Sequence, residues 1–428
     1  MSSETKREKG TPVVRGITTK LLHADRRGGV EHGATHKPIH VATAFGYERA
    51  ADLIAVFQGE LSGHVYARQG NPTTAALEQK ITALEDGVGT LCFATGMAAI
   101  AAVMWGLLKR GDHLVASAYL FGNTASLLQT LEAIGCEVTL VDATDALQVE
   151  RALRPETRLV FVETIANPRT QVADLDGIGA LCAARGVLFV VDNTMTGPCL
   201  FRPKNVGAGL VINSLTKSIG GHGNALGGAV TDTGRFDWAT HPNILPAYRK
   251  GASTAWGLLQ LRKKGLRDMG ATLTADSAHR IATGIETLEL RVERTCENAL
   301  LLALWLQDRP EVRKVHYPGL AEHPQHARAR KHFAAFGAML SFDLREGVDM
   351  LGLLDALQIV ILSSHLGDNR TLAIPVAQTI FWEMGADKRA AMGIADTLIR
   401  VAVGIEDIDD LRDDFAQALD AAAVRASG

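Results

Sequence analysis

The sequence contains few of the residues that mark special classes of protein. Its 428 residues include only five cysteines, which are odd in number, widely spaced and mostly in apolar surroundings. This pattern favours buried reduced thiols over a disulfide framework or a metal cluster. Two histidine pairs have metal-like spacing, His32 with His36 and His323 with His326, but both lie in polar loops without a partner motif. We therefore expect no metal site.

A large net charge, long apolar runs and an apolar leader are absent as well. The formal net charge of −3 gives no indication of a nucleic-acid partner or of an anionic membrane surface. The most apolar segments, such as 97–108, are too short and too interrupted to span a bilayer. Residues 1–15 are polar and charged, without the apolar core of a signal peptide, so we expect a cytoplasmic protein.

The common nucleotide-binding motifs are also missing. Gly221 and Gly223 begin a GxGxxG pattern, but Leu226 occupies the place of its third glycine. No GxxxxGK[ST] loop occurs either. The hypothesis of a nicotinamide-dependent or nucleotide-hydrolysing enzyme therefore lacks its main support.

The length and the pattern of elements predict two domains preceded by an arm. We place an N-terminal arm at 1–70, a cofactor domain at 71–270 and a C-terminal domain at 271–428, and expect little regular structure over 1–60. Helices are predicted at 74–85, 96–109, 123–134, 146–153 and 175–185. Strands are predicted at 89–94, 113–117, 137–141, 158–163, 187–192 and 209–213. Strands that alternate with helices indicate a mostly parallel sheet covered on both faces.

The remainder of the chain predicts a smaller α/β domain. It begins after an aromatic and basic insert at 236–268. One long helical stretch over 272–308, strands at 337–343, 359–363 and 398–405, and a final helix over 407–424 are expected there. Such a domain suits closure over a neighbouring cofactor domain.

Lys217 and Asp192 carry the strongest chemical signal. Lys217 follows the buried strand at 208–213 and lies among Ser214, Thr216 and a glycine-rich turn, where a lysine can form a Schiff base with an aldehyde cofactor. Asp192 ends another apolar strand, where a carboxylate can pair with a pyridine nitrogen. A surface lysine and a turn aspartate remain the alternatives for each residue by itself.

Six stretches in order make the chain resemble the pyridoxal-phosphate enzymes of cysteine and methionine metabolism, the family of cystathionine γ-synthase and O-acetylhomoserine sulfhydrylase. The stretches are Tyr66-Ala67-Arg68 with Asn71-Pro72-Thr73, Thr95-Gly96-Met97-Ala98-Ala99, Glu163-Thr164 with Asn167-Pro168, Val191-Asp192-Asn193-Thr194, the run around Lys217, and 398–406. The resemblance implies an aspartate-aminotransferase-like, fold type I pyridoxal-phosphate transferase with a large mostly parallel-sheet domain and a smaller C-terminal α/β domain.

The same resemblance assigns roles to individual residues. Lys217 would bind the cofactor covalently, Asp192 its ring nitrogen, and Phe121 would stack on its ring. The phosphate would be held by Gly96, Met97, Ser214 and Thr216, together with Tyr66 and Arg68 of a neighbouring subunit. The substrate would contact Asn167, Ser364 and Arg400, although Asn167 could instead contact the ring hydroxyl of the cofactor. Lys217, Tyr66 and Phe121 would take part in catalysis, and a homodimer or homotetramer would share its active sites.

Arg400 and Phe121 refine the expected substrate. Arg400 interrupts an apolar run, and a buried arginine needs an anion, for which an α-carboxylate fits its planar fork. A structural ion pair is the alternative. Phe121 stands where the family usually has a tyrosine, so the phenol that could protonate a departing sulfur is missing. A carboxylate, with a pKa near ~4, departs unaided, whereas a thiolate, at about 8.5, does not. We therefore expect γ-replacement on an O-acylhomoserine by sulfide or cysteine.

Two alternatives stay open at this point. One is a cystathionine or methionine lyase, which eliminates at the γ- or β-carbon. The other is a cofactor-binding protein without catalysis, although Lys217, Asp192 and Arg400 are all in place. His365 stands where the family often has a serine near the substrate carboxylate, and its role as a base, an indirect contact or a core histidine is left open.

Overall fold

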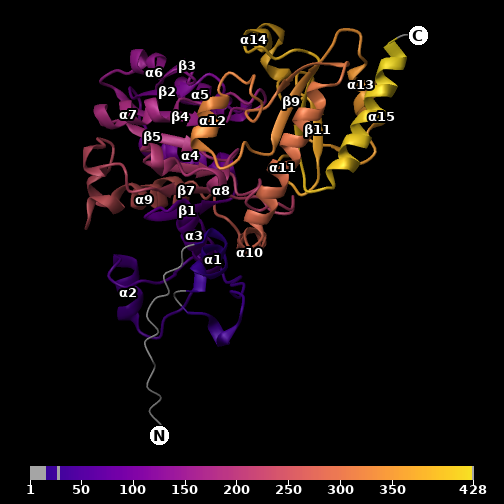
Figure 1. Ribbon diagram of the computed structural model, residues 1–428. Helices are drawn as coiled ribbons and strands as arrows, with labels where there is room; N and C mark the ends of the chain where they lie inside the picture. The colour runs from indigo at the N-terminus through magenta and orange to yellow at the C-terminus, as the bar shows by residue number, and fades with distance from the viewer. Residues whose placement is uncertain (1–15, 27–28, 427–428) are drawn as a thin grey trace.

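The computed structural model describes residues 16–26 and 29–426, which form an N-terminal segment, a large domain and a smaller C-terminal domain (Figure 1). The first fifteen residues of the expected arm lie outside the described residues. The expectation of little regular structure over 1–60 is wrong in two places, because α1 (Ile17–His23) and α2 (Ala50–Gln58) are helical. Across the described ranges, no helix combines the length and apolarity needed to cross a membrane.

The large domain is built on a seven-stranded sheet. Its strands are, in spatial order, β1 (Gly89–Phe93), β7 (Gly228–Asp232), β6 (Leu210–Asn213), β5 (Leu188–Asp192), β4 (Thr157–Glu163), β2 (His113–Ser117) and β3 (Glu137–Val141). The pairs from β6 to β3 are parallel, and β7 is antiparallel to both of its neighbours. The expected mostly parallel sheet of a fold type I enzyme is therefore confirmed, and six of its strands lie where the sequence predicts them.

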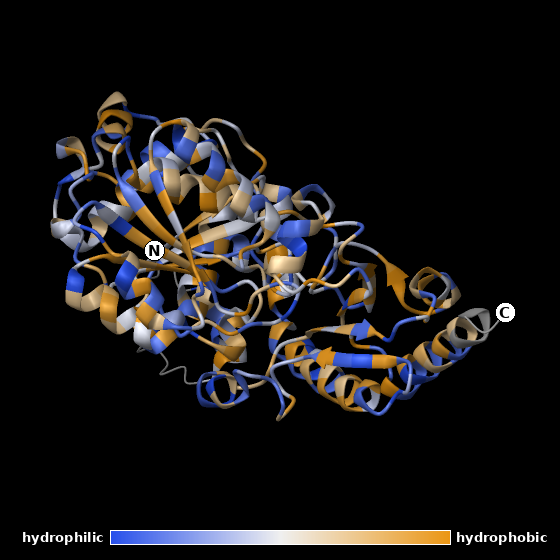
Figure 2. Ribbon diagram, turned by 90° about the horizontal axis from the view of Figure 1, so that it is seen from above, coloured by the Kyte–Doolittle hydropathy of each residue, from blue (hydrophilic) through white to orange (hydrophobic). Residues whose placement is uncertain are grey.

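Helices cover both faces of this sheet (Figure 2). They are α3 (Pro72–Glu85), α4 (Gly96–Leu107), α5 (Gly122–Ala133), α6 (Ala146–Ala152), α7 (Leu175–Arg185), α8 (Gly197–Leu200) and α9 (Trp256–Gln260). α9 continues into a π-helical segment, Leu261–Arg267, inside the aromatic and basic insert.

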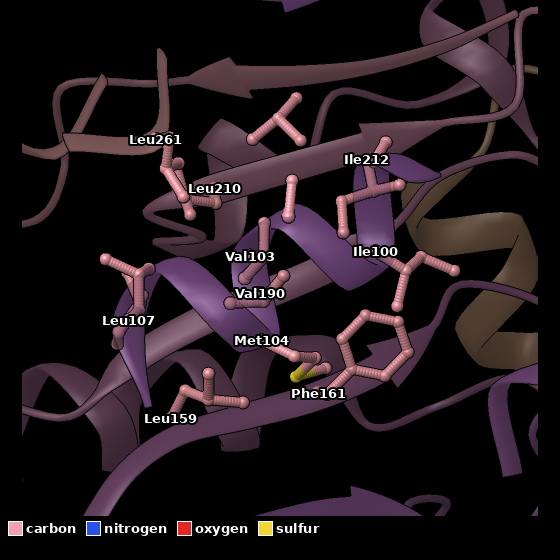
Figure 3. Close-up of a cluster of buried hydrophobic side chains, with 14 of the residues drawn as sticks. Ile100, Val103, Met104, Leu107, Leu159, Phe161, Val190, Leu210, Ile212 and Leu261 are labelled. Atoms are coloured by element: carbon pink, nitrogen blue, oxygen red, sulfur yellow. The ribbon is translucent and has the colours of Figure 1, made fainter. Parts of the chain in front are cut away.

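The core of the large domain forms where α4 crosses the sheet (Figure 3). Val103, Met104 and Leu107 of α4 are fully buried and belong to one cluster with Phe161 of β4 and Val190 of β5. Burying a side chain of this size contributes about 1.5–3 kcal/mol, so this face of α4 anchors the helix firmly. Its N-terminus is thereby fixed at the end of the sheet where the strands β4, β5 and β6 finish.

The C-terminal domain contains a five-stranded sheet. Its strands are, in spatial order, β10 (Ile361–Leu362), β11 (Leu372–Pro375), β12 (Leu398–Ala402), β9 (Met339–Leu344) and β8 (Val312–His316). The helices are α10 (Ala275–Ile285), α11 (Leu288–Gln307), α12 (His326–His332), α13 (Met350–Ala356), α14 (Ala386–Ala391) and α15 (Ile408–Ala426). The smaller α/β domain is confirmed.

The single helix expected over 272–308 is wrong, because the chain leaves helical geometry between α10 and α11 at Thr287. Ile281 of α10 packs into a cluster with Leu77 and Ile81 of α3, and thus on the large domain. α11 instead carries Leu302 and Leu306 into the core of the small domain. The break therefore lets one stretch of sequence serve two cores, while the domain boundary at 271 stays a prediction.

Candidate active site

Three parallel strands bring the predicted lysine and the predicted acid to one edge of the large sheet. β4 pairs with β5, and β5 pairs with β6, all in parallel. Asp192 is the last residue of β5, and Lys217 follows four residues after the end of β6. Because parallel strands deliver their carboxyl ends to the same side, ligands of such sheets bind in the crevice outside these ends.

Lys217 is a partly buried lysine with an altered protonation equilibrium. Burial, reinforced by the positive charge of Arg400, lowers its pKa to about 8. Its Nζ lies 3.3 Å from Nδ1 of His365, which belongs to the C-terminal domain. A lysine with a lowered pKa has a larger uncharged fraction near neutral pH, and the uncharged amine is the form that attacks a carbonyl group.

Asp192 has a second carboxyl group beside it. Glu163 ends β4 and is its register partner across the β4–β5 ladder. Burial, followed by the charge of Asp192, raises the pKa of Glu163 to about 8. Burial also raises the pKa of Asp192, against hydrogen bonds from Thr194 that favour its ionised form. Two adjacent carboxyl groups resist ionising together, so Glu163 keeps its proton and Asp192 carries the charge.

Glu163 also fixes the predicted stacking residue. The backbone N–H of Phe121 donates to Oε1 of Glu163 at 2.7 Å, directly before the first residue of α5. Phe121 is therefore tied to the strand end that adjoins Asp192, which is the edge where a ring paired with Asp192 would lie.

The predicted phosphate cradle lies at the N-terminus of α4, and its role in holding a phosphate stays a prediction. Thr95 caps the helix by accepting from the N–H of Ala98 at 3.0 Å, whereas Gly96 and Met97 occupy the first turn, whose N–H groups have no intrahelical acceptor. A Cβ atom on Gly96 would lie 2.8 Å from Cβ and 2.9 Å from Oγ of Ser214. The hydroxyl of Ser214 thus adjoins these free N–H groups.

Thr216 is used differently from Ser214. Its Oγ1 donates to the carbonyl of Gly227 at 3.1 Å and accepts from the N–H of the same residue at 3.0 Å. The hydroxyl therefore shapes the turn that carries Lys217, and its role in holding a phosphate stays a prediction.

Arg400 is a buried cation bonded only to neutral groups in the described chain. It lies on β12 and is 1% exposed. Its Nη2 donates to the carbonyls of Ser364 and His365, both at 2.9 Å, and its Nε has no hydrogen-bond partner among the described residues. Because neutral carbonyls do not compensate a buried positive charge, we expect an anion to bind beside Arg400.

The other two predicted substrate contacts differ in character. Asn167 is buried, and its Oδ1 has no partner within the described ranges, so it is free to orient a bound group. Ser364 is exposed and meets Arg400 through its backbone carbonyl. The residue of this loop that contacts Lys217 is His365.

Tyr66 and Arg68 lie in the N-terminal segment rather than in this cluster. Tyr66 is 43% exposed, and the guanidinium of Arg68 lies 5.5 Å from the centre of its ring. Nη1 of Arg68 donates to the carbonyl of Arg267 at 2.7 Å. Their assignment to the active site of a neighbouring subunit stays a prediction.

Sequence reasoning missed the part played by two residues. Glu163 has no assigned role in it, although it ends the strand at 158–163 in the way that Asp192 ends the next strand. His365 is recognised only as an unusual residue, because its contact with Lys217 joins two domains. The first could be found from the strand pattern, and the second requires the structure.

The chain is similar to known enzymes over most of its length. Residues 18–420 match the family described as "Cys/Met metabolism PLP-dependent enzyme". An L-methionine gamma-lyase from Fusobacterium nucleatum subsp. polymorphum is 36% identical and is covered to 98%, with 95% of this chain. An O-succinylhomoserine sulfhydrylase from Pseudomonas aeruginosa is also 36% identical, with 91% of each chain covered.

A solved structure extends the similarity to the cofactor. It is a putative O-acetylhomoserine (thiol)-lyase from Campylobacter jejuni that contains a pyridoxyl-lysine monophosphate. It has a TM-score of 0.88 against this chain and is 28% identical to it, with 95% of this chain and 100% of that chain covered.

The residues of this chain fit pyridoxal phosphate. Gly96 leaves the space that a Cβ would fill beside Ser214, and the free N–H groups there suit a phosphate. Lys217 offers an amine of lowered pKa, and Asp192 offers a carboxylate. These residues would hold the phosphate group, the aldehyde carbon and the ring nitrogen of the cofactor, respectively.

Proposed function

Because the chain belongs to the family of pyridoxal-phosphate-dependent enzymes of cysteine and methionine metabolism, we propose that it catalyses γ-replacement on an O-acylhomoserine. A thiol, either sulfide or cysteine, takes the place of the acyl group, and the product is homocysteine or cystathionine. The observation that carries the proposal is Phe121, tied to Glu163 at the edge of the site, where the resembling family usually has a tyrosine.

The missing phenol favours one kind of leaving group. A tyrosine at this position could protonate a departing thiolate, which has a pKa of about 8.5 as a cysteine side chain. The phenyl ring of Phe121 cannot, so sulfur would have to leave as the basic thiolate. A carboxylate, whose pKa is nearer ~4, needs no such proton.

The roles of the other residues follow from their chemistry. Arg400 and Asn167 hold the substrate carboxylate, which supplies the anion that the buried guanidinium lacks. Lys217 takes the proton from Cα in its uncharged form, which its lowered pKa provides. Asp192 stays ionised because Glu163 keeps the shared proton. When bound, the cofactor supplies the electron-accepting ring for these steps.

We further propose that the site is completed by a second subunit in a homodimer or homotetramer. Helix α2 contributes no buried residue, and its Ile54 and Phe57 are 54% and 69% exposed. Val41 on the same segment is 81% exposed. Such a concentration of exposed apolar side chains supports an interface that covers it. Tyr66 and Arg68 of this segment would reach the partner's cofactor phosphate, and Tyr66 would assist in deprotonating the incoming amine or thiol.

Complementation between two inactive variants tests the shared site. Lys217→Ala and Arg68→Ala subunits, expressed together, should recover about one quarter of wild-type activity, since half of randomly paired dimers are hybrids with one intact site. Each variant expressed by itself should show little activity. Absence of recovery, with hybrid dimers demonstrated by mass spectrometry, would remove the shared site from the account.

A lyase acting on methionine or cystathionine is the second candidate, because an L-methionine gamma-lyase is as similar to this chain as a sulfhydrylase is. The two reactions are separated by comparing the release of α-ketobutyrate from methionine with the consumption of acetyl- and succinylhomoserine. The proposal predicts faster consumption of an acylhomoserine, and it fails if methionine is turned over faster.

We also propose that the protein is cytoplasmic. This location suits the described cysteines, which form no disulfide and of which all but Cys199 are buried.

A further inference from the structure

A loop of the C-terminal domain lies directly against the backbone around Lys217. A Cβ atom on Gly367, which has a φ of +73°, would lie 2.4 Å from the backbone nitrogen of Ser218. Two residues further on, the N–H of Asn369 donates to the carbonyl of Gly221 at 3.1 Å. The loop is therefore in contact with the Lys217 segment at Gly367 and again at Asn369, which places His365 beside Lys217.

His365 meets Lys217 as a hydrogen-bond acceptor. Burial, and then the charge of Lys217, lowers the pKa of its imidazole, so the ring is uncharged near neutral pH. The charged groups that face it are Lys217, Arg400 and Asp368. An ammonium group has only hydrogens to offer, so Nδ1 at 3.3 Å from Nζ is the acceptor, and the ring hydrogen is placed on Nε2.

The backbone groups of His365 are hydrogen-bonded as well. Its backbone carbonyl accepts from Nη2 of Arg400, and its backbone N–H donates to Oγ of Ser363 at 3.2 Å. Its Nε2 is buried and has no partner among the described residues. Nδ1 is therefore the ring nitrogen that is hydrogen-bonded in the described chain, and its partner is the reactive lysine.

We propose that His365 is a positioning residue for Lys217, whose Nδ1 accepts a hydrogen bond from the lysine amino group and thereby sets both its place in the site and its affinity for a proton. The inference rests on Lys217 being the reactive lysine of the proposed function. No bond is made or broken in this contact, and the proton stays on Lys217. The ammonium form gains the hydrogen bond, so His365 opposes part of the loss of proton affinity that burial and Arg400 impose.

The test measures the pKa of Lys217 in the cofactor-free protein. Lysines labelled with ¹³C at Cε are titrated by NMR, and the resonance that is lost in Lys217→Ala identifies the group. In His365→Leu the proton-binding constant of Lys217 should fall roughly tenfold, the effect of losing one hydrogen bond to a charged group. In His365→Asn, whose side-chain oxygen can replace Nδ1, the constant should stay near that of the wild type.

His241→Leu is the matched control. His241 is buried whereas His365 is half-buried, but both have a lowered pKa, that of His241 to about 4, and an Nε2 without a partner among the described residues. The Nδ1 of His241 accepts from the N–H of Asn243 and not from a lysine. This variant should leave the titration of Lys217 unchanged. Thermal unfolding of every variant reports on the fold, and His365→Ala serves if His365→Leu does not fold, since alanine has no side-chain acceptor.

An unchanged Lys217 titration in a folded His365→Leu or His365→Ala protein would overturn the inference, as would an equal shift in His241→Leu. The measurement needs neither cofactor nor turnover. It therefore separates this inference from the choice between replacement and elimination, which can fail while the contact between His365 and Lys217 holds.

Discussion

Glu163 and Asp192 stand side by side as register partners at the carboxyl ends of β4 and β5. Both carboxyl groups have raised pKa values because they are buried, and Glu163 reaches about 8. The pair holds one negative charge and one proton, and Glu163 also accepts the N–H of Phe121. One buried carboxyl group therefore supports both the acid that would face the cofactor ring and the residue that would stack on it.

The pair makes the stability of the cofactor-free protein depend on pH. The folded-state pKa of Glu163 lies above its ordinary value of 4.5, so the folded protein binds more protons than the unfolded chain between these values. The contribution of Glu163 to the free energy of unfolding therefore falls as the pH rises from about 4.5 through about 8. Glu163→Gln stays neutral and keeps an oxygen for Phe121, so it should match the wild type near pH 5 and become the more stable protein above pH 8.

Urea unfolding at several pH values measures this difference. The two stability curves should diverge with rising pH. Curves that run parallel from pH 5 to pH 9 would contradict the assignment of the shared proton to Glu163.

Gly96→Ala should weaken cofactor binding without unfolding the protein. The added methyl group would lie 2.8 Å from Cβ of Ser214, and relieving such overpacking costs typically about 1–3 kcal/mol. Displacement of Ser214 and of the first turn of α4 should lower the affinity for pyridoxal phosphate roughly tenfold or more. Fluorescence titration of the cofactor-free protein measures the dissociation constant.

Gly46→Ala is the control for Gly96→Ala, because a Cβ at Gly46 meets no atom within 4 Å. It should bind the cofactor as the wild type does. Equal affinities in both variants would mean that the N-terminus of α4 does not hold the phosphate.

Arg400→Lys should impair substrate binding although the charge is kept. Lysine lacks the planar fork, and losing one hydrogen bond to a charged group costs about 1.5–3 kcal/mol, or roughly 10–100-fold in affinity. We expect the loss mainly in KM for an acylhomoserine, measured in steady-state assays. Arg389→Lys provides the comparison, since Arg389 is also buried in this domain but pairs with Asp396. A wild-type KM in Arg400→Lys would contradict its role as the carboxylate anchor.

Phe121→Tyr should shift the reaction toward elimination of sulfur. The variant restores a phenol where a departing thiolate needs a proton, and general acid catalysis typically contributes about 10²–10⁴-fold. The ratio of methionine elimination to acylhomoserine consumption should rise roughly 100-fold. Phe236→Tyr, a similarly half-buried residue in the insert, should leave that ratio as it is. The same ratio in Phe121→Tyr and the wild type would show that the phenyl ring does not set the specificity.

Much of this arrangement could be predicted from local sequence. The strands at β2 and β3 fall at the predicted residues, because short apolar runs between helical segments leave few alternatives. β7, β8 and β11 lie outside the predicted strands for different reasons. β11 has only four residues and ends in a proline. β7 has the run Gly228-Ala229-Val230-Thr231-Asp232, which is dominated by small and polar residues, and β8 is an edge strand with a basic centre at Arg313-Lys314.

The remaining differences depend on long-range contacts. Helix α2 contributes no residue to a core of the described chain, so no packing within the subunit marks this segment as regular structure. His365 and Lys217 are 148 residues apart in sequence and meet because the C-terminal domain lies on the large domain. The packing of the two domains therefore decides that His365 contacts Lys217, and no local sequence pattern predicts this packing.

The γ-replacement reaction is tested most directly by offering O-acetylhomoserine together with sulfide and cysteine and identifying the products by mass spectrometry. We expect homocysteine or cystathionine, which would establish γ-replacement and name the thiol. α-Ketobutyrate and ammonia as the only products would contradict it, because elimination would then proceed at a site that has Phe121 in place of the phenol.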